Sequence, residues 1–156
     1  MLLIREAESK DLDQVYQLEK NLFKDFCWTP SQILKEYENE FSKIWLLEEK
    51  NEIIGYLILR EVKPEVEILR IGIKKEFQHK GKGSYFLKEL IDFYKEKGIK
   101  KIFLEVKISN SPAYNFYKKM GFKEIYKRKK YYDKEDGIVM VKEINNEGIY
   151  YDKSRD

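Results

Sequence analysis

The chain has 156 residues, a length that fits one compact domain with a sizeable core. Hydrophobic residues make up 42% of it and charged residues 38%, with a net charge of only +3, so the composition excludes a disordered chain. A nearly balanced charge also predicts no direct nucleic-acid partner. A single cysteine, Cys27, and a single histidine, His79, exclude an internal disulfide and predict no metal site.

The N-terminal residues MLLIREAES are too short and too quickly charged for a signal peptide. No apolar run approaches the length of a membrane span. These features predict a cytoplasmic protein with no membrane partner. They leave the oligomeric state, monomer or dimer, open.

Hydrophobic periodicity and turn residues divide the chain into alternating strand and helix patterns. The expected elements are a strand at 2–7, a helix capped by Ser9 or Asp11 and ending near 23, a helix at 30–40, two strands joined at 50–51, a strand ending near 73, a helix at 82–97, a strand over KKIFLEVKI, a short helix from Ser111 to Gly121, and two closing strands. The order β-α-α-β-β-β-α-β-α-β-β predicts an α/β fold with a mixed sheet and helices on both faces. We expect one domain over residues 1–145 and a flexible tail at 146–156.

A glycine-rich stretch, QHKGKGS, stands between a predicted strand and the best helix of the chain. It contains Gln78, His79, Lys80, Gly81, Lys82, Gly83 and Ser84. Free amides at a helix N-terminus bind phosphate where no side chain blocks the approach. A plain strand-to-helix turn would also use glycine for its unusual dihedrals, and the motif alone does not separate the two interpretations. A nucleotide P-loop fits poorly, because no GK[ST] follows at its spacing.

The order of motifs around this stretch resembles the GNAT family of acetyl-CoA-dependent N-acetyltransferases. The family's Q/R-x-x-G-x-G/A motif stands here as QHKGKG, followed by the amphipathic helix, the buried strand, "SN" and NFYKKMGF. Within the family the chain resembles the RimI type, the ribosomal-protein alanine N-acetyltransferases, in FCWTPSQIL, LEVKISNSPAYNFYKKMGF and RKKYYDKEDGIVM. Departures are Cys27 before the Trp and Gly137 in place of a more usual Ala.

The resemblance implies a GNAT fold, with a mostly antiparallel central sheet, and acetyl-CoA as co-substrate. It implies that the QHKGKGS stretch binds the pyrophosphate. Backbone groups of Ile71 and Ile73 and the side chain of Asn110 would contact the pantetheine arm. From the residues alone, Asn110 is equally an ordinary turn or capping residue before Pro112.

Two carboxylates are candidates for the general base that takes the proton of an acceptor amine. Glu105 interrupts the apolar strand KIFLEVKI, where a carboxylate is costly to bury. A Glu paired with a lysine at a strand end fits that pattern as well, and the resemblance favours Glu105 as the base. Glu67 is the second candidate; the alternative for it is an exposed partner of Arg70 or Lys63.

Tyr117 matches the tyrosine that family members aim at the thioester sulfur, so the resemblance implies a proton donor there. The pattern alone makes it one of four core-spaced residues of a short helix. Trp28, Tyr131 and Tyr132 are candidates for contacting the acceptor, and local packing explains them equally well. The run KRKK at 127–130 suits an acidic or RNA-rich partner particle, although a solvated strand face is the commoner explanation.

The leading hypothesis is an acyltransferase that acetylates the α-amine of a protein N-terminus, plausibly a ribosomal protein with a small first residue. The alternatives are a GNAT enzyme that acetylates a small amine or a lysine side chain and, more distantly, a non-catalytic acyl-CoA-binding sensor. A sensor needs neither a base nor a proton donor, so the pair of Glu105 and Tyr117 favours an enzyme.

Overall fold

The computed structural model describes residues 1–129 and 135–144, and the predicted tail lies outside them. The described residues form two compact units, taken separately below. The first unit comprises residues 1–62 and 67–89, and the second comprises residues 63–66 and those from 90 onward.

The element order agrees with the prediction from the sequence. The described strands are β1 (Leu2–Glu6), β2 (Ser42–Glu49), β3 (Glu52–Val62), β4 (Glu65–Ile73), β5 (Lys101–Lys107), β6 (Lys123–Arg128) and β7 (Gly137–Glu143). The described α-helices are α1 (Leu12–Phe23), α2 (Pro30–Glu38), α3 (Lys82–Glu96) and α4 (Ser111–Lys119). Three short 3-10 turns, η1 (Ser9–Asp11), η2 (Lys24–Phe26) and η3 (Lys75–Phe77), complete the order. The fold is therefore α/β, with mostly antiparallel strand pairs.

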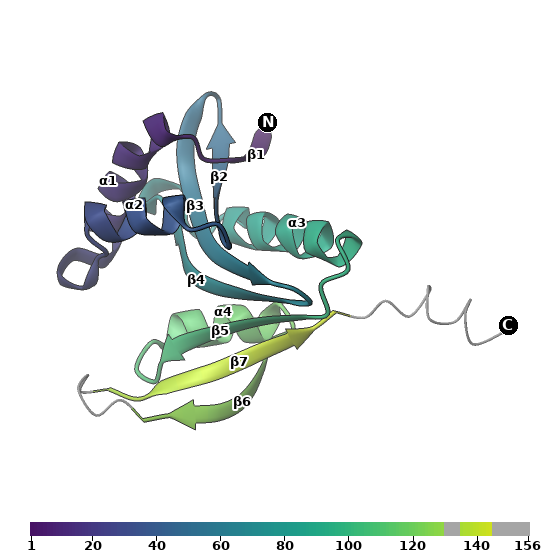
Figure 1. The fold of residues 1–156 in the computed structure, drawn as a ribbon. Coiled ribbons are helices and arrows are strands. Elements are labelled where there is room, and N and C mark those ends of the chain that lie inside the picture. Colours follow the sequence, from purple (N-terminus) through teal and green to yellow (C-terminus); the bar gives the residue numbers. More distant parts are fainter. Residues whose placement is uncertain (130–134, 145–156) are drawn as a thin grey trace, which may run out of the picture. The chain divides into compact units, whose positions relative to one another are not determined.

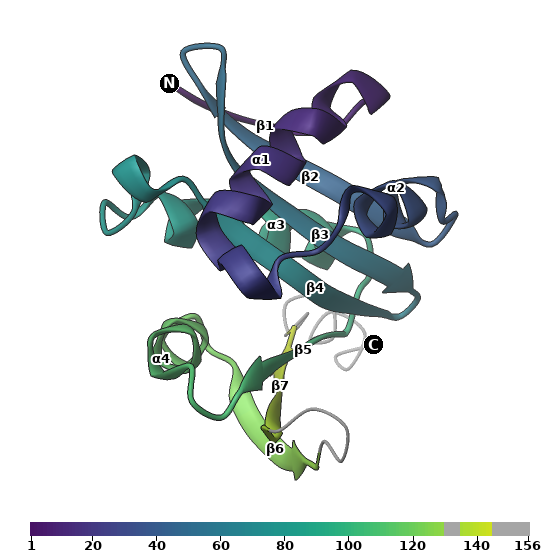
Figure 2. The same cartoon turned by 90° about the vertical axis from the view of Figure 1, so that its left-hand side faces the viewer.

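In the first unit the strands follow the order β1-β2-β3-β4. The β1–β2 and β2–β3 pairs are antiparallel, and the tight turn between β2 and β3 places Lys50 and Asn51 at positive φ. Helices α1 and α2 cover one face of this sheet, and the N-terminal half of α3 lies on the other face (Figures 1 and 2). Thr29 caps α2 with Pro30 at its first position, as predicted.

A buried carboxylate lies inside the helical layer of the first unit. Glu19 falls on the stripe of α1 that the sequence pattern assigns to the core, and its side chain is fully buried. It accepts hydrogen bonds from the Tyr56 hydroxyl, from Arg70 Nε at 3.0 Å and from the Trp28 backbone N–H at 2.8 Å. Burial and the adjacent Glu19 carboxylate raise the pKa of the Tyr56 hydroxyl. The network joins α1, the start of α2, β3 and β4.

The second unit is built on a three-stranded antiparallel sheet in the order β5-β7-β6. Its buried face includes Ile102, Leu104 and Val106 of β5 with Ile138 and Met140 of β7. Figure 1 shows α4 lying along this sheet. Gly121 ends α4 at a φ of 95°, a conformation that glycine adopts at low cost. Strand β6 lies at the edge of this sheet, and all of its residues are exposed.

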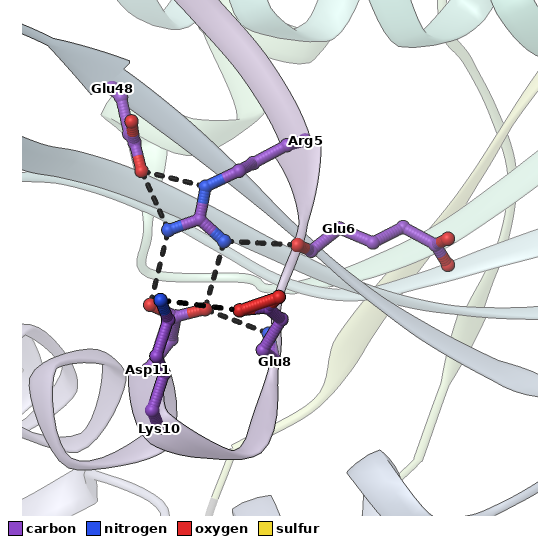
Figure 3. A network of polar contacts seen from close by, with 6 residues as sticks. All are labelled: Arg5, Glu6, Glu8, Lys10, Asp11 and Glu48. Carbon is purple, nitrogen blue, oxygen red and sulfur yellow. Dashed lines mark hydrogen bonds and ion pairs between the residues drawn. The ribbon is translucent and has the colours of Figure 1, made fainter. Parts of the chain in front are cut away.

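A polar network ties β1 to the turn before α1 (Figure 3). Asp11, one of the two predicted caps, is the N-cap residue of α1, but its side chain makes no capping hydrogen bond to that helix. Its buried carboxylate accepts from Arg5 Nη1 at 2.9 Å and from the Glu8 backbone N–H at 2.7 Å. Arg5 also pairs with Glu48 of β2 at 2.6 Å. The hydrogen bond from Arg5 lowers the pKa of Asp11 and outweighs the opposing effect of burial.

Because the pKa of Asp11 is lower in the folded chain, its charge stabilises the fold above its ordinary pKa of 3.8, and this contribution is lost as the pH falls below that value. We predict that Asp11→Asn lowers the free energy of unfolding by about 1–3 kcal/mol at pH 7. The difference from wild type should shrink below about pH 4. Urea titrations at both pH values measure it. Glu6→Gln, which removes an exposed partner of Lys43, is the matched control and should change stability by less than about 0.5 kcal/mol. An equal loss for Asp11→Asn at both pH values would contradict the prediction.

Candidate active site

The glycine stretch forms the junction between β4 and α3 in the first unit. After η3 the chain passes through His79 at a φ of 61° and Gly81 at a φ of 79°, and the Tyr85 N–H donates to the Gly81 carbonyl at 3.0 Å. Gly81 therefore precedes the first turn of a 15-residue helix, and the amides of residues 82–84 have no acceptor within that helix. The left-handed conformation explains Gly81, whereas Gly83 lies in the first helical turn. This junction fits a pyrophosphate by its amides and the helix dipole.

Some side chains around the junction hold the loop in place by polar contacts, and others are exposed to solvent. Lys82 pairs with Glu49 of β2 at 2.8 Å, and this contact lowers the pKa of Glu49. Gln78 Nε2 donates to the Ile73 carbonyl at 2.8 Å and so holds the loop against the end of β4. Lys80 and Ser84 are exposed. The cation nearest to the helix start is thus already neutralised in part by a carboxylate.

Glu67 of β4 does not pair with Arg70, one of the two partners that the sequence suggested for it. Glu67 is exposed, as expected, but its suggested partner Arg70 binds Glu19 and donates to the Phe26 carbonyl at 2.8 Å. The side chains of Ile71 and Ile73 are half-buried.

Trp28 is half-buried against the core of the first unit. Its backbone N–H is fixed by Glu19, and its ring lies 6.0 Å from the Arg70 guanidinium carbon. Packing accounts for its position, and contact with an acceptor stays a prediction. Tyr131 and Tyr132 lie outside the described residues.

A hollow of about 610 Å³ opens between the end of α1 and the end of β4, a feature that the sequence pattern did not reveal. Leu18, Leu22 and Cys27 supply its apolar lining. Cys27 is a free, half-buried thiol there. Asn21 and charged residues of both signs complete the lining: Lys20, Lys24, Asp25, Lys74, Lys75 and Glu76.

The Glu105 carboxylate lies over Gly137 on the sheet of the second unit. Glu105 alternates with the buried Leu104 and Val106, so its side chain leaves β5 on the opposite face. A Cβ at Gly137 of the neighbouring strand would lie 1.9 Å from Glu105 Oε2, so the missing side chain provides the space for the carboxylate. Arg128 of β6, which is opposite Gly137 in the register, brings its Nε to 3.8 Å from Oε1. The glycine therefore lets an acid and an arginine approach each other across the middle strand.

Tyr117 is the buried residue of α4. Its ring makes edge-to-face contacts with Phe116 and Phe122, with ring centres 5.3 Å and 5.6 Å apart. Asn110 is the N-cap of α4, and its side chain accepts from the Ala113 N–H at 3.2 Å. The capping alternative for Asn110 is therefore observed. Its contact with pantetheine and the role of Tyr117 as a proton donor stay predictions.

Within residues 1–129 and 135–144, no group of three or more His, Cys, Asp or Glu residues has the geometry to hold a metal ion. The same residues contain no helix long and apolar enough to cross a membrane.

Comparison with known proteins identifies the class of this chain. Residues 11–122 match the acetyltransferase (GNAT) family, and the chain belongs to it. GNAT enzymes use acetyl-CoA, which agrees with the β4–α3 junction described above.

Among individual relatives, the [ribosomal protein bS18]-alanine N-acetyltransferase of Haemophilus influenzae is 33% identical over 137 residues, which cover 88% of this chain and 92% of the relative. The crystal structure of the ribosomal-protein-S18-alanine N-acetyltransferase from Escherichia coli matches with a TM-score of 0.85 and 28% identity, covering 93% of this chain and 95% of that one. A PaiA N-acetyltransferase from Thermoplasma acidophilum, solved in complex with coenzyme A, shares the fold at a TM-score of 0.72 and 23% identity, with 92% of this chain and 99% of that chain covered.

The first-turn glycine gives the sharper test of the phosphate cradle, because Gly83 is helical and not at positive φ, so its backbone conformation is open to other residues. We predict that Gly83→Val abolishes acetyl-CoA binding in calorimetry, since the new side chain projects over the free amides. Lys88→Val places the same β-branched residue on the exposed side of α3 and should bind normally. Unchanged affinity in Gly83→Val would show that the junction is only a turn.

Proposed function

We propose that this chain is an acetyl-CoA-dependent Nα-acetyltransferase that modifies the N-terminus of a protein, plausibly a ribosomal protein with a small first residue. The observation that carries the proposal is the position of Glu105, a carboxylate held over Gly137 on an apolar strand in a chain of the GNAT family. Relatives named as bS18-alanine N-acetyltransferases support the type of acceptor. Such an acceptor predicts action in the cytoplasm.

The reaction replaces a carbon–sulfur bond by a carbon–nitrogen bond, with acetyl-CoA supplying the acetyl group as a thioester. The acceptor must be neutral to attack, and a free α-amine has a pKa of about 7.7–8.0, against about 10.4 for a lysine side chain. A carboxylate is a strong enough base for the former and a poor one for the latter. Glu105 accepts a proton from the acceptor ammonium and so leaves a neutral amine to attack; the proton that the nitrogen loses as the new bond forms passes to solvent.

The sulfur leaves more easily if a proton is available to it, and the hydroxyl of Tyr117 is the group that we assign to this step. A tyrosine hydroxyl can donate and afterwards be reprotonated from solvent. Ile71 and Ile73 of β4 would contribute backbone groups to pantetheine, and Asn110 its side chain. The amides at 82–84 would hold the pyrophosphate.

Glu105→Gln should lower kcat by about 10²–10⁴-fold, the usual contribution of a general base, with little change in the dissociation constant of acetyl-CoA. The loss should shrink at high pH, where the α-amine is neutral without help. A pH–rate profile with a peptide acceptor measures both effects. Glu67→Gln is the matched control on β4 and should retain its rate. If Glu105→Gln ran at full rate with the wild-type profile while Glu67→Gln lost activity, the roles of the two residues would have to be exchanged.

Peptides that begin with Ala or Ser should be acetylated faster than free lysine or spermidine. The physical reason is the lower pKa of an α-amine, which leaves more of it neutral at a working pH near 7. Mass spectrometry of a mixed panel of acceptors locates the acetyl group. Acetylation of lysine side chains alone, or spermidine outcompeting every peptide, would overturn the N-terminal assignment and favour the alternative of a small-amine or lysine acetyltransferase. Acetyl-CoA binding without transfer to any acceptor would favour a sensor.

A further inference from the structure

The two compact units differ in charge, which the balanced total conceals. The described part of the first unit has 14 Lys and Arg residues against 16 Asp and Glu residues. The described part of the second unit has 13 against 8. Such a difference in net charge between two parts of a chain is typical of proteins that bind polyanions.

The positive charge of the second unit is concentrated between the end of α4 and the end of β6. Residues 118–129 include six Lys or Arg residues and one acid, Glu124. We call the exposed residues Lys123, Ile125, Tyr126, Lys127, Arg128 and Lys129 the β6 edge. Strand β6 lies at the edge of its three-stranded sheet, and its side chains, which alternate between the two faces of the sheet, are all exposed there.

The cations of the β6 edge are less neutralised than those of the first unit. Arg5, Arg60 and Arg70 each form close pairs with a buried or half-buried carboxylate. Among the described residues, the lysines at 123, 127 and 129 form no ion pair, and Arg128 approaches Glu105 only to 3.8 Å. Their charge is therefore available to a partner.

A simpler explanation is that lysines protect an exposed strand edge from pairing with other chains. That explanation accounts for the lysines but not for the apolar residues among them. Ile125 is 47% exposed and Tyr126 is 55% exposed, in the middle of the edge. A protected edge would avoid such residues, whereas a surface for single-stranded nucleic acid combines cations with aromatic rings on which bases stack.

We propose that the β6 edge is a docking surface for single-stranded RNA. Lysines near both ends of the strand contact phosphates, and Tyr126 stacks on a base. A strand of this length extends over about 17–20 Å, enough to follow several nucleotides of a backbone. An acidic peptide could satisfy the cations, but its Asp and Glu side chains offer no ring on which Tyr126 can stack, whereas every RNA base does. The proposal goes beyond acetyl transfer and does not depend on the acceptor.

The test measures binding of a fluorescein-labelled single-stranded RNA of 20 nucleotides by anisotropy, over a series of salt concentrations. We expect a dissociation constant of about 10⁻⁴–10⁻⁶ M near physiological salt. Replacing Lys123, Lys127 and Lys129 together by Gln should weaken binding at least 10-fold at low salt and reduce the slope of log K against log salt by about 2. Tyr126→Ala should weaken binding several-fold and leave the salt slope unchanged.

The matched control replaces Lys20, Lys35 and Lys88 by Gln, three exposed helix lysines of the first unit. It changes the total charge equally and should bind RNA as wild type does. Neither triple variant should alter the rate with a free peptide acceptor, which keeps this test separate from that of the proposed function. The proposal fails if wild type does not bind the RNA, if both triple variants lose affinity equally, or if a poly-glutamate of 20 residues binds more tightly than the RNA.

Discussion

The first unit depends on a carboxylate that has no access to water. Isolated, the buried Glu19 side chain would cost several kcal/mol, and only a complete set of donors makes its burial tolerable. Those donors come from places far apart in the sequence: Tyr56 on β3, Arg70 on β4 and the backbone of Trp28 before α2. Because each bond is directional, the network fixes the position of the α1–α2 connection against the sheet. The Arg70 guanidinium, 3.6 Å from the centre of the Phe23 ring, adds a cation–π contact to the same point.

The same requirement for compensation recurs where the chain approaches its proposed chemistry. Lys82 would oppose the dipole at the start of α3, and Glu49 offsets its charge there. The Glu105 carboxylate fills the space over Gly137 of β7 and approaches Arg128 of β6, so residues of two other strands set its position. In each case a charged group near the site is oriented by a partner on a different strand, which is what a preorganised site requires.

Charge is also organised on the scale of whole units. The first unit pairs its arginines with carboxylates, while the second unit leaves a row of cations along its edge strand. A net charge near zero is therefore an average over two surfaces of opposite character, and it does not describe the partners of either. The expectation of no nucleic-acid partner rested on the net charge of the whole chain. That net charge does not reveal the local excess of cations at the β6 edge.

The sequence by itself determined the elements and the family. Periodicity located every described strand and α-helix to within a few residues, because local signals such as Pro30 after Thr29, the turn at Lys50–Asn51 and the glycine after α4 act over neighbouring residues. The glycine stretch and NFYKKMGF identified the GNAT family for the same reason, since both motifs are contiguous. Only the tertiary structure decided which residues the buried charged side chains contact. Asp11 stands at the N-cap of α1, as one of the two predicted caps, yet its carboxylate binds Arg5, and Arg70, one of two suggested partners of Glu67, binds Glu19 instead. Buried charges take whichever donors the fold brings within hydrogen-bond distance, and those donors lie up to 51 residues away in the chain.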